Sequence, residues 1–341
     1  MQIIQKKLLE VESDWQKELA ESFTTPESLL SYLGFSPEEY QAHFKARKLF
    51  PMRVPRFFAN LMRAKHWDDP LLQQVIPRAE EFLNVRGFSE DPLKERSNDT
   101  AGMLHKYKNR VLLIVKGGCA INCRYCFRRH FPYQENSVNK AQWQNVFDKI
   151  AADTNIDEVI FSGGDPLMAK DKQLAWMAET LEKIPHIKRL RIHTRLPVVI
   201  PSRVTNEFLS WMSNTRLQKV VVFHINHANE VSPALAEACK KLKLQGVTLL
   251  NQGVFLKAIN DSPTAIVNLN NALFEAGIMP YYMYLLDKVK GAAHFDIPDT
   301  SAINIMREVI SQQSGYMVPK LMREISGRAS KTPIDLNLGS Q

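Results

Sequence analysis

The chain has 341 residues, 45% hydrophobic and 23% charged, which is the composition of a globular protein and excludes a disordered or fibrous one. No apolar run approaches the ~20 residues that cross a bilayer, and segment 1–15 carries charges within its apolar part, unlike a secretory signal. The formal net charge of +8 is spread along the chain rather than gathered in a basic block. We therefore expect a cytoplasmic protein with neither a membrane nor a nucleic-acid partner.

The first part of the chain, residues 1–105, has helical and irregular patterns. Thr25-Pro26 and Ser36-Pro37 each place a capping hydroxyl before a proline at the first helical position, which predicts two helix starts. Segments 51–58 and 66–77 have the composition of turns. We expect 1–105 to form a helical wrap around a larger body.

From residue 110 onward, β-rich apolar runs alternate with amphipathic helical stretches. The runs are 110–118, 156–164, 187–195, 219–227, 247–258 and 279–287, and the clearest helical stretches are 140–153, 171–184 and 232–246. This alternation predicts βαβ units with a parallel sheet. We expect an α/β fold: a partial parallel (β/α)6 barrel at 106–315, followed by a C-terminal segment, 316–341, whose run 316–325 pairs at an edge.

Glycine and polar residues collect where each predicted strand ends, as in GGC, SGGDP, HTR, HINH, NQG and LLD. Barrel enzymes build their active sites at the carboxyl ends of their strands. The pattern predicts one composite site made from loops that are far apart in the sequence.

Three of the four cysteines, Cys119, Cys123 and Cys126, fall within eight residues after the first strand. Four cysteines are too few for a disulfide framework, and clustered thiols favour a metal site. Three thiolates on a cuboidal iron–sulfur cluster leave one iron open. The alternatives are zinc with a fourth ligand such as His130, and an incidental cluster of thiols; Cys239 lies within a predicted helix.

The spacing Cys-x3-Cys-x2-Cys, with Tyr125 before the last cysteine, resembles the signature of the radical S-adenosylmethionine (SAM) superfamily. The resemblance implies a [4Fe-4S] cluster whose open iron binds SAM. Gly163, Gly164 and Asp165 resemble the element that contacts the amino group of SAM, although SGGDP alone would be a turn. Arg195, ending the third strand, is a candidate cation for the carboxylate of SAM, or else a surface arginine.

Several stretches resemble the lysine 2,3-aminomutase family, and the match covers nearly the whole chain. They include FPMRVP (50–55), CRYCFRR (123–129), SGGDPL (162–167), NQGVFLKAIND (251–261) and SGYMVP (314–319). LLDKVKGAAHF (285–295) and ASKTPIDL (329–336) resemble the short subfamily that makes β-lysine for modifying elongation factor P. The resemblance implies an isomerase that converts L-α-lysine to β-lysine with a [4Fe-4S] cluster, SAM and pyridoxal phosphate (PLP). Its implied partners are L-lysine, a flavodoxin- or ferredoxin-type electron donor, and the ligase that modifies elongation factor P.

The resemblance also assigns residues to PLP. The family places its PLP lysine after SGYxVP, where Lys331 stands; Lys320 is the local competitor but lies too close to that motif. Only Gly327 remains of the glycine run that surrounds the family's lysine. By family position Arg110 contacts the PLP phosphate, and Tyr107 stacks on the pyridine ring.

The substrate residues follow in the same way. Arg128 matches the arginine that binds the substrate carboxylate, and Asp287 matches the first of two aspartates that bind the distant ammonium. Glu324 stands at the second aspartate position, which keeps the charge and adds one methylene of reach. The alternative functions are a radical SAM aminomutase for a different amino acid, a nucleic-acid-modifying iron–sulfur protein and a zinc-stabilised binding module. Glutamate is a poor substrate candidate because its charge would be repelled by Asp287 and Glu324.

Overall fold

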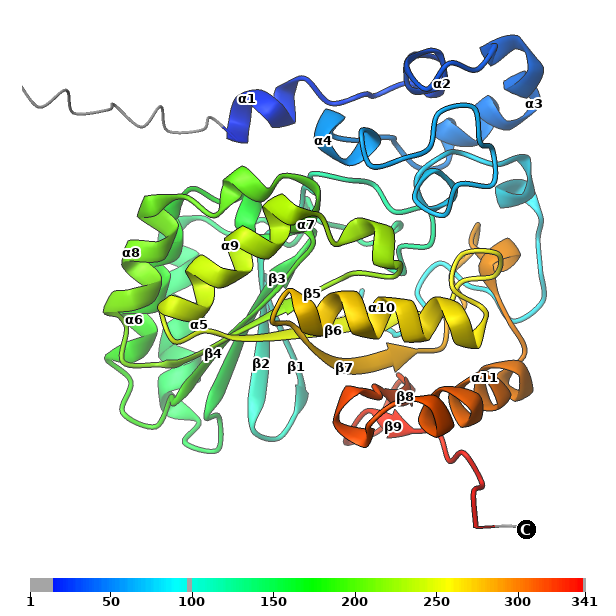
Figure 1. Cartoon of the computed structure of the whole chain (residues 1–341). Helices are drawn as coiled ribbons and strands as arrows, with labels where there is room; N and C mark the ends of the chain where they lie inside the picture. The colour runs from blue at the N-terminus through cyan, green and yellow to red at the C-terminus, as the bar shows by residue number, and fades with distance from the viewer. Residues whose placement is uncertain (1–14, 97–99, 340–341) are drawn as a thin grey trace, which may run out of the picture.

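The computed structural model describes residues 15–96 and 100–339. Its strands form one nine-stranded sheet in which spatial neighbours follow chain order (Figure 1). The pairs from β2 to β8 are parallel, and the edge strands β1 and β9 pair antiparallel. The strands are β1 Met103–Tyr107, β2 Arg110–Lys116, β3 Glu158–Gly163, β4 Arg189–Thr194, β5 Gln218–Phe223, β6 Thr248–Val254, β7 Met279–Tyr284, β8 Lys320–Arg323 and β9 Thr332–Pro333.

The predicted α/β fold with a mainly parallel sheet is confirmed. Five of the six predicted runs contain a whole strand of the series β2 to β7, and the run 219–227 contains all of β5 except its first residue, Gln218. The seventh run contains β8. Strand β1 was not predicted, and its first residues lie in a segment expected to be helical and irregular. It is a short edge strand with a single buried residue, so it has no apolar alternation to reveal it.

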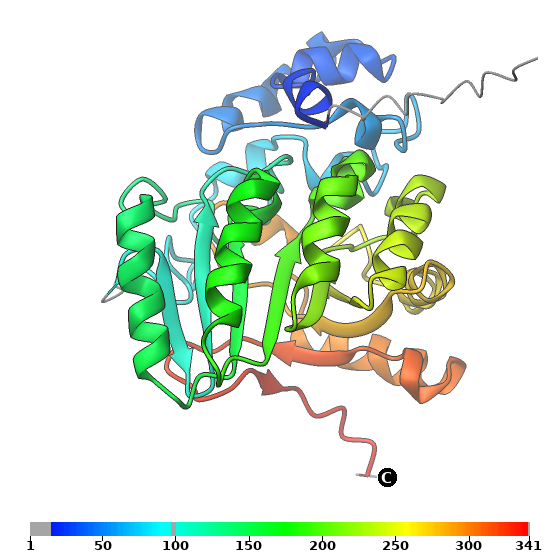
Figure 2. The same ribbon diagram turned by 90° about the vertical axis from the view of Figure 1, so that its left-hand side faces the viewer.

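Helices connect the parallel strands and cover the outside of the sheet. Figure 2 shows the helices that follow β2, β3 and β4 standing side by side against it. The helices are α1 Trp15–Ala20, α2 Pro26–Tyr32, α3 Gln41–Phe44, α4 Arg56–Ala59, α5 Lys140–Ala152, α6 Asp171–Glu182, α7 Leu196–Val199, α8 Asn206–Asn214, α9 Pro233–Leu244, α10 Pro263–Glu275 and α11 Asp299–Gln312. Short 3₁₀ turns are η1 Pro37–Tyr40, η2 Lys45–Lys48, η3 Leu72–Gln74, η4 Ala79–Phe82, η5 Pro166–Met168, η6 Pro201–Arg203, η7 Ala228–Glu230, η8 Ala293–Phe295 and η9 Gly315–Met317.

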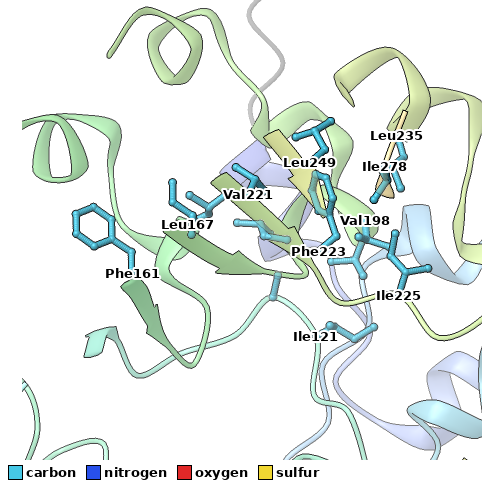
Figure 3. Packing of buried hydrophobic residues seen from close by; sticks show 14 of the residues in the cluster. Ile121, Phe161, Leu167, Val198, Val221, Phe223, Ile225, Leu235, Leu249 and Ile278 are labelled. Atoms are coloured by element: carbon cyan, nitrogen blue, oxygen red, sulfur yellow. The ribbon is translucent and has the colours of Figure 1, made fainter. Parts of the chain in front are cut away.

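The core lies between this sheet and its helices. Figure 3 shows part of it, with Val221, Phe223 and Leu249 of β5 and β6 among the labelled side chains. Each of these side chains is almost completely buried, and such burial contributes about 1.5–3 kcal/mol per large apolar side chain. In the described ranges, 15–96 and 100–339, no helix is long and apolar enough to span a bilayer.

The predicted helix starts have different outcomes. Thr25 caps α2, because its hydroxyl accepts a hydrogen bond from the backbone N–H of Ser28, and Pro26 is the first helical residue. Ser36 precedes a 3₁₀ turn rather than an α-helix, and its side chain makes no capping hydrogen bond. The prediction is thus confirmed for the first start and only partly met at the second.

The cysteine loop, residues 117–126, follows β2 and carries Cys119, Cys123 and Cys126. The N-terminal segment lies over the end of the sheet that carries this loop (Figure 1). Arg124, between two of the cysteines, is completely buried. It donates hydrogen bonds to the carbonyl oxygens of Phe50 and Ala46, and to the carboxylate of Glu81 at 2.6 Å. Arg129 donates to the same carboxylate at 2.7 Å. These contacts fasten the cysteine loop to the N-terminal segment.

Candidate active site

A cavity of about 540 Å³ lies inside the partial barrel, within the usual size range of small-molecule sites. It is lined by polar and aromatic side chains from both ends of the sheet and from the C-terminal segment. The alternatives His130 and Lys320 are not among its lining residues. Every residue that the sequence assigned to the cluster, SAM, PLP or the substrate lines it: Tyr107, Arg110, Cys119, Cys123, Cys126, Arg128, Gly163, Gly164, Asp165, Arg195, Asp287, Glu324 and Lys331.

The cavity is longer than the predicted site at the carboxyl ends of the strands. Arg110, Glu158 and Arg189, the first residues of β2, β3 and β4, line it as well. A closed barrel fills its interior with layers of apolar side chains. Here β4 directs polar side chains into the cavity, so the interior remains open from the cysteine loop to the strand starts.

The two glycines of SGGDP lie directly against the cysteine loop. The backbone N–H of Gly164 donates to the carbonyl of Lys116 at 2.7 Å. A Cβ at Gly164 would stand 2.6 Å from the carbonyl oxygens of Gly117 and Gly118, closer than real side chains come. Gly163 has a φ of +122°, which favours glycine. Both glycines are therefore needed for the close approach of the two loops.

Asp165 joins the ends of β3 and β4. Its carboxylate accepts hydrogen bonds from the hydroxyl of Thr194 and from the backbone N–H groups of Leu167, Arg195 and Leu196, at 2.8–3.0 Å. Both oxygens are thus used by the protein. A contact between Asp165 and the amino group of SAM stays a prediction.

The three thiols line the cavity, and three thiolates are the ligand set of an iron–sulfur cluster that keeps one iron open. Burial, and then the nearby Cys123, raise the pKa of Cys126 to about 11. A tetrahedral zinc site would bring its sulfurs to about 3.8 Å from one another, whereas a cuboidal cluster binds each thiolate at a separate iron. In the described part of the chain, no three Cys, His, Asp or Glu side chains are grouped to hold one metal ion. His130, the alternative zinc ligand, instead contacts the carbonyl oxygen of Lys290.

Arg195 is buried at the carboxyl end of β4. Its two terminal nitrogens contact four protein groups, on Cys123, Tyr125, Gln74 and Glu230. Its Nε–H is buried, and among the described residues it has no hydrogen-bond partner. A carboxylate of SAM would therefore find only one unused donor on this guanidinium.

Lys331 lies in the cavity because the C-terminal segment folds back on itself. Strands β8 and β9 pair antiparallel, and Gly327 has a φ of +80° in the turn between them. The amine of Lys331 contacts the hydroxyl of Tyr284 and lies 3.8 Å from a carboxylate oxygen of Glu324. Burial lowers the pKa of Lys331 to about 8, against the opposing effect of Glu324. Its competitor Lys320 is exposed on β8.

Tyr107 and Arg110 lie together at the turn between β1 and β2. The guanidinium of Arg110 is 4.0 Å from the centre of the Tyr107 ring. The hydroxyl of Tyr107 donates to Glu324 at 2.8 Å. The structure thus brings both residues to the Lys331 side of the cavity, while their contacts with PLP stay predictions.

The three predicted substrate residues differ in how far their charges are already paired within the protein. Arg128 forms a two-pronged ion pair with Glu95. Glu324 accepts from Tyr107 and lies near Lys331. Asp287 faces the cavity, where burial and then the charge of Glu324 raise its pKa to about 7. Asp287 is therefore the carboxylate best placed to gain from a cationic ligand.

Sequence reasoning assigned no separate role to several basic residues of the cavity. Arg189, Arg191 and His193 alternate along β4 and all line the cavity. The period-two pattern of RLRIHT was the signal for them. Within the described part of the chain, Nε of Arg191 and Nε2 of His193 are buried and have no hydrogen-bond partner. The Nε–H of Arg191 is a donor that fits an anionic ligand group such as a phosphate. Glu95 had no sequence signal.

Comparisons with known proteins agree with this geometry. A model of the radical SAM superfamily matches residues 113–254. The L-lysine 2,3-aminomutase of Escherichia coli (strain K12) is 55% identical, over 96% of each chain. That of Haemophilus influenzae is 51% identical, over 96% of this chain and 97% of the relative. The Clostridium subterminale enzyme is 32% identical, over 94% and 78%. The predicted resemblance is confirmed: this chain belongs to the L-lysine 2,3-aminomutase family of radical SAM proteins.

Proposed function

We propose that this protein is an isomerase that converts L-lysine to β-lysine by moving the amino group from carbon 2 to carbon 3. The observation that carries the proposal is the single cavity that joins the cysteine loop to Lys331 and to Asp287. The 55% identity to an L-lysine 2,3-aminomutase over 96% of each chain supports the same reaction.

The cofactor sites divide between the two sides of the cavity. Cys119, Cys123 and Cys126 hold the [4Fe-4S] cluster, next to the SGGDP loop. Lys331 links PLP, and Arg110 faces its phosphate. When bound, the cluster with SAM supplies a radical that abstracts hydrogen, and PLP carries the migrating amino group. The chain's own part is to orient the lysine and to exclude water.

Substrate recognition follows from the charges. Nη1 of Arg128 has only long contacts, 3.3 Å to the Ser162 hydroxyl and 3.4 Å to the Gly163 carbonyl, so it is the prong available to the substrate carboxylate. Asp287 takes the distant ammonium. An amino acid with an anionic side chain is disfavoured here, because Asp287 and Glu324 would repel it.

The test is conversion of L-lysine by protein reconstituted anaerobically with iron and sulfide, then given PLP, SAM and a low-potential reductant. Product is identified by mass spectrometry. We expect β-lysine from the wild type, and none from Cys126→Ala or Lys331→Ala. Matched controls are Cys239→Ala, a buried cysteine of α9, and Lys320→Ala, the exposed lysine of β8; both should remain active. Cleavage of SAM without β-lysine would overturn the lysine assignment.

We extend the proposal to the partners of the reaction. A flavodoxin- or ferredoxin-type protein donates the electron, and a ligase attaches the β-lysine to elongation factor P. The support is the resemblance of 285–295 and 329–336 to the short subfamily that serves this modification. The expected result is a mass increase of elongation factor P that needs the ligase and the β-lysine made by this protein. An increase of the same size with α-lysine alone would contradict it.

A further inference from the structure

The guanidinium of Arg195 contacts the thiol of Cys123, one of the three residues of the cysteine cluster. Nη1 of Arg195 donates to Sγ of Cys123 at 2.7 Å and to the hydroxyl of Tyr125 at 2.7 Å. Arg195 is only 6% exposed, so little water screens its charge from the sulfur. This is a direct contact between a permanently charged group and one of the three cysteines.

Arg195 is fixed from its other side by two buried partners. Nη2 donates to Glu230 at 2.8 Å and to the side-chain oxygen of Gln74 at 2.6 Å. Glu230 and Gln74 are completely buried. The amide of Gln74 in turn donates to Glu230 at 3.0 Å, as does the backbone N–H of Asn226. The guanidinium is therefore held in one orientation, toward the cysteine loop.

The carboxylate of Glu230 also carries the negative charge that pairs with the guanidinium of Arg195. Hydrogen bonds to the cluster sulfurs and nearby positive charge stabilise the more negative, reduced cluster, whereas nearby negative charge stabilises the oxidised one. Because both side chains are buried and fixed, their charges act on the cluster directly and are not screened by water molecules that would first have to reorient. Arg195 and Glu230 thus act on the cluster in opposite directions, with Arg195 in contact with the sulfur.

We propose that Arg195 and Glu230 form an opposed charge pair that sets the reduction potential of the cluster bound at Cys123. The inference rests on the cluster of the proposed function and is independent of the lysine substrate. In this arrangement Arg195 is a positioning residue that makes the one-electron reduction easier, and Glu230 limits that effect. Gln74 makes the N-terminal segment part of the same network.

The experiment is a potentiometric titration of reconstituted full-length protein, without SAM or lysine. Dithionite reduces the cluster, and redox mediators equilibrate the cluster with the electrode. Electron paramagnetic resonance measures the fraction of reduced cluster at each potential. The variants are Arg195→Gln, Arg195→Lys and Glu230→Gln. Arg203→Gln is the matched control, because Arg203 is a completely buried arginine paired with Asp171, outside the cavity lining. Iron content and thermal unfolding are measured for each protein.

We expect Arg195→Gln to lower the midpoint and Glu230→Gln to raise it. Each change should alter the reduction equilibrium at least tenfold, which corresponds to about 59 mV for a one-electron couple. Arg195→Lys should lie between Arg195→Gln and wild type, and Arg203→Gln should match the wild type.

Unchanged midpoints in Arg195→Gln and Glu230→Gln with full iron content would overturn the proposal, as would shifts of both in the same direction. Weaker SAM binding by Arg195→Gln at an unchanged potential would also overturn it, and would assign the guanidinium to the SAM carboxylate. If Arg195→Gln cannot hold a cluster, Glu230→Gln decides: a raised midpoint supports the proposal and an unchanged one overturns it. The redox titration contains no lysine, so its result tests the charge pair even if the protein fails the aminomutase assay.

Discussion

Arg128 and Glu95 form a two-pronged ion pair in the wall of the cavity, with Nε and Nη2 of the arginine 2.6 and 3.1 Å from the carboxylate oxygens. Both side chains are more than nine-tenths buried. Against the effect of burial, Arg128 and Lys106 lower the pKa of Glu95 to about 2, so the carboxylate stays ionised. The pair leaves Nη1 of Arg128 as the remaining prong toward the cavity.

The first prediction is that this pair stabilises the cofactor-free protein. Glu95→Gln should lower the free energy of unfolding by about 3 kcal/mol, because it leaves the buried guanidinium of Arg128 without its carboxylate. Arg128→Gln should lower it by less, because Lys106 remains 2.7 Å from the carboxylate of Glu95. The double variant should lose less than the sum of the two single losses. Urea unfolding of the four proteins measures the cycle. Additive losses would show that the two side chains do not depend on one another.

The second prediction concerns pH and Asp287. With a pKa of about 7, Asp287 is mostly protonated at pH 6 and mostly ionised at pH 8. Only the ionised form attracts the lysine ammonium, so lysine should bind about tenfold more weakly at pH 6 than at pH 8. Calorimetric titration of the PLP-loaded protein with L-lysine measures this. Asp287→Asn should bind weakly and remove the pH dependence; an unchanged dependence in that variant would assign it to another group.

The third prediction concerns Glu324, whose charge raises the pKa of both Asp287 and Lys331. Glu324→Gln should lower both, because it removes a repelling charge from the carboxyl and an attracting charge from the amine. The pH midpoint of lysine binding reports on Asp287, and the pH dependence of PLP attachment reports on Lys331. Glu324→Asp keeps the charge and should keep both values within the wild-type range. A rise in either value for Glu324→Gln would contradict the charge argument.

The fourth prediction concerns the contact between the SGGDP loop and the cysteine loop. A methyl group at Gly164 would stand 2.6 Å from two carbonyl oxygens of the cysteine loop. Gly164→Ala should therefore displace that loop, cost about 1–3 kcal/mol of stability, and reduce the iron bound on reconstitution. Gly315→Ala is the matched control, because nothing lies within 4 Å of its added methyl group. Normal iron content in Gly164→Ala would show that the cysteine loop accommodates the change.

The elements that could be predicted from the sequence are those with a local cause. The strands β2 to β7 coincide with apolar runs of the sequence. Helices α2 and α9 each begin after a capping residue, with proline as the first helical residue. The short spacing of the three cysteines keeps their loop recognisable without any tertiary information. Lys331 was assigned to PLP from family position, since the many lysines of the chain are indistinguishable by composition.

The partners of the site residues could not be predicted in this way. Glu95 stands 33 residues from Arg128, and Gln74 stands 121 residues from Arg195. A single acidic or amide residue in an irregular segment has the same kind of sequence neighbours whether its side chain is exposed to solvent or buried. Its role depends on which charge folding brings beside it.

The sequence by itself determined the alternating strands and helices, the cysteine loop and the two glycines at the carboxyl end of β3. Only the tertiary structure decided which side chains share the cavity, which carboxylates are already paired, and which way Arg195 points. The physical reason is that propensity, capping and hydrophobic periodicity act between near neighbours in the chain. The strength of a charge or hydrogen bond instead depends on burial and on partners that folding alone brings together.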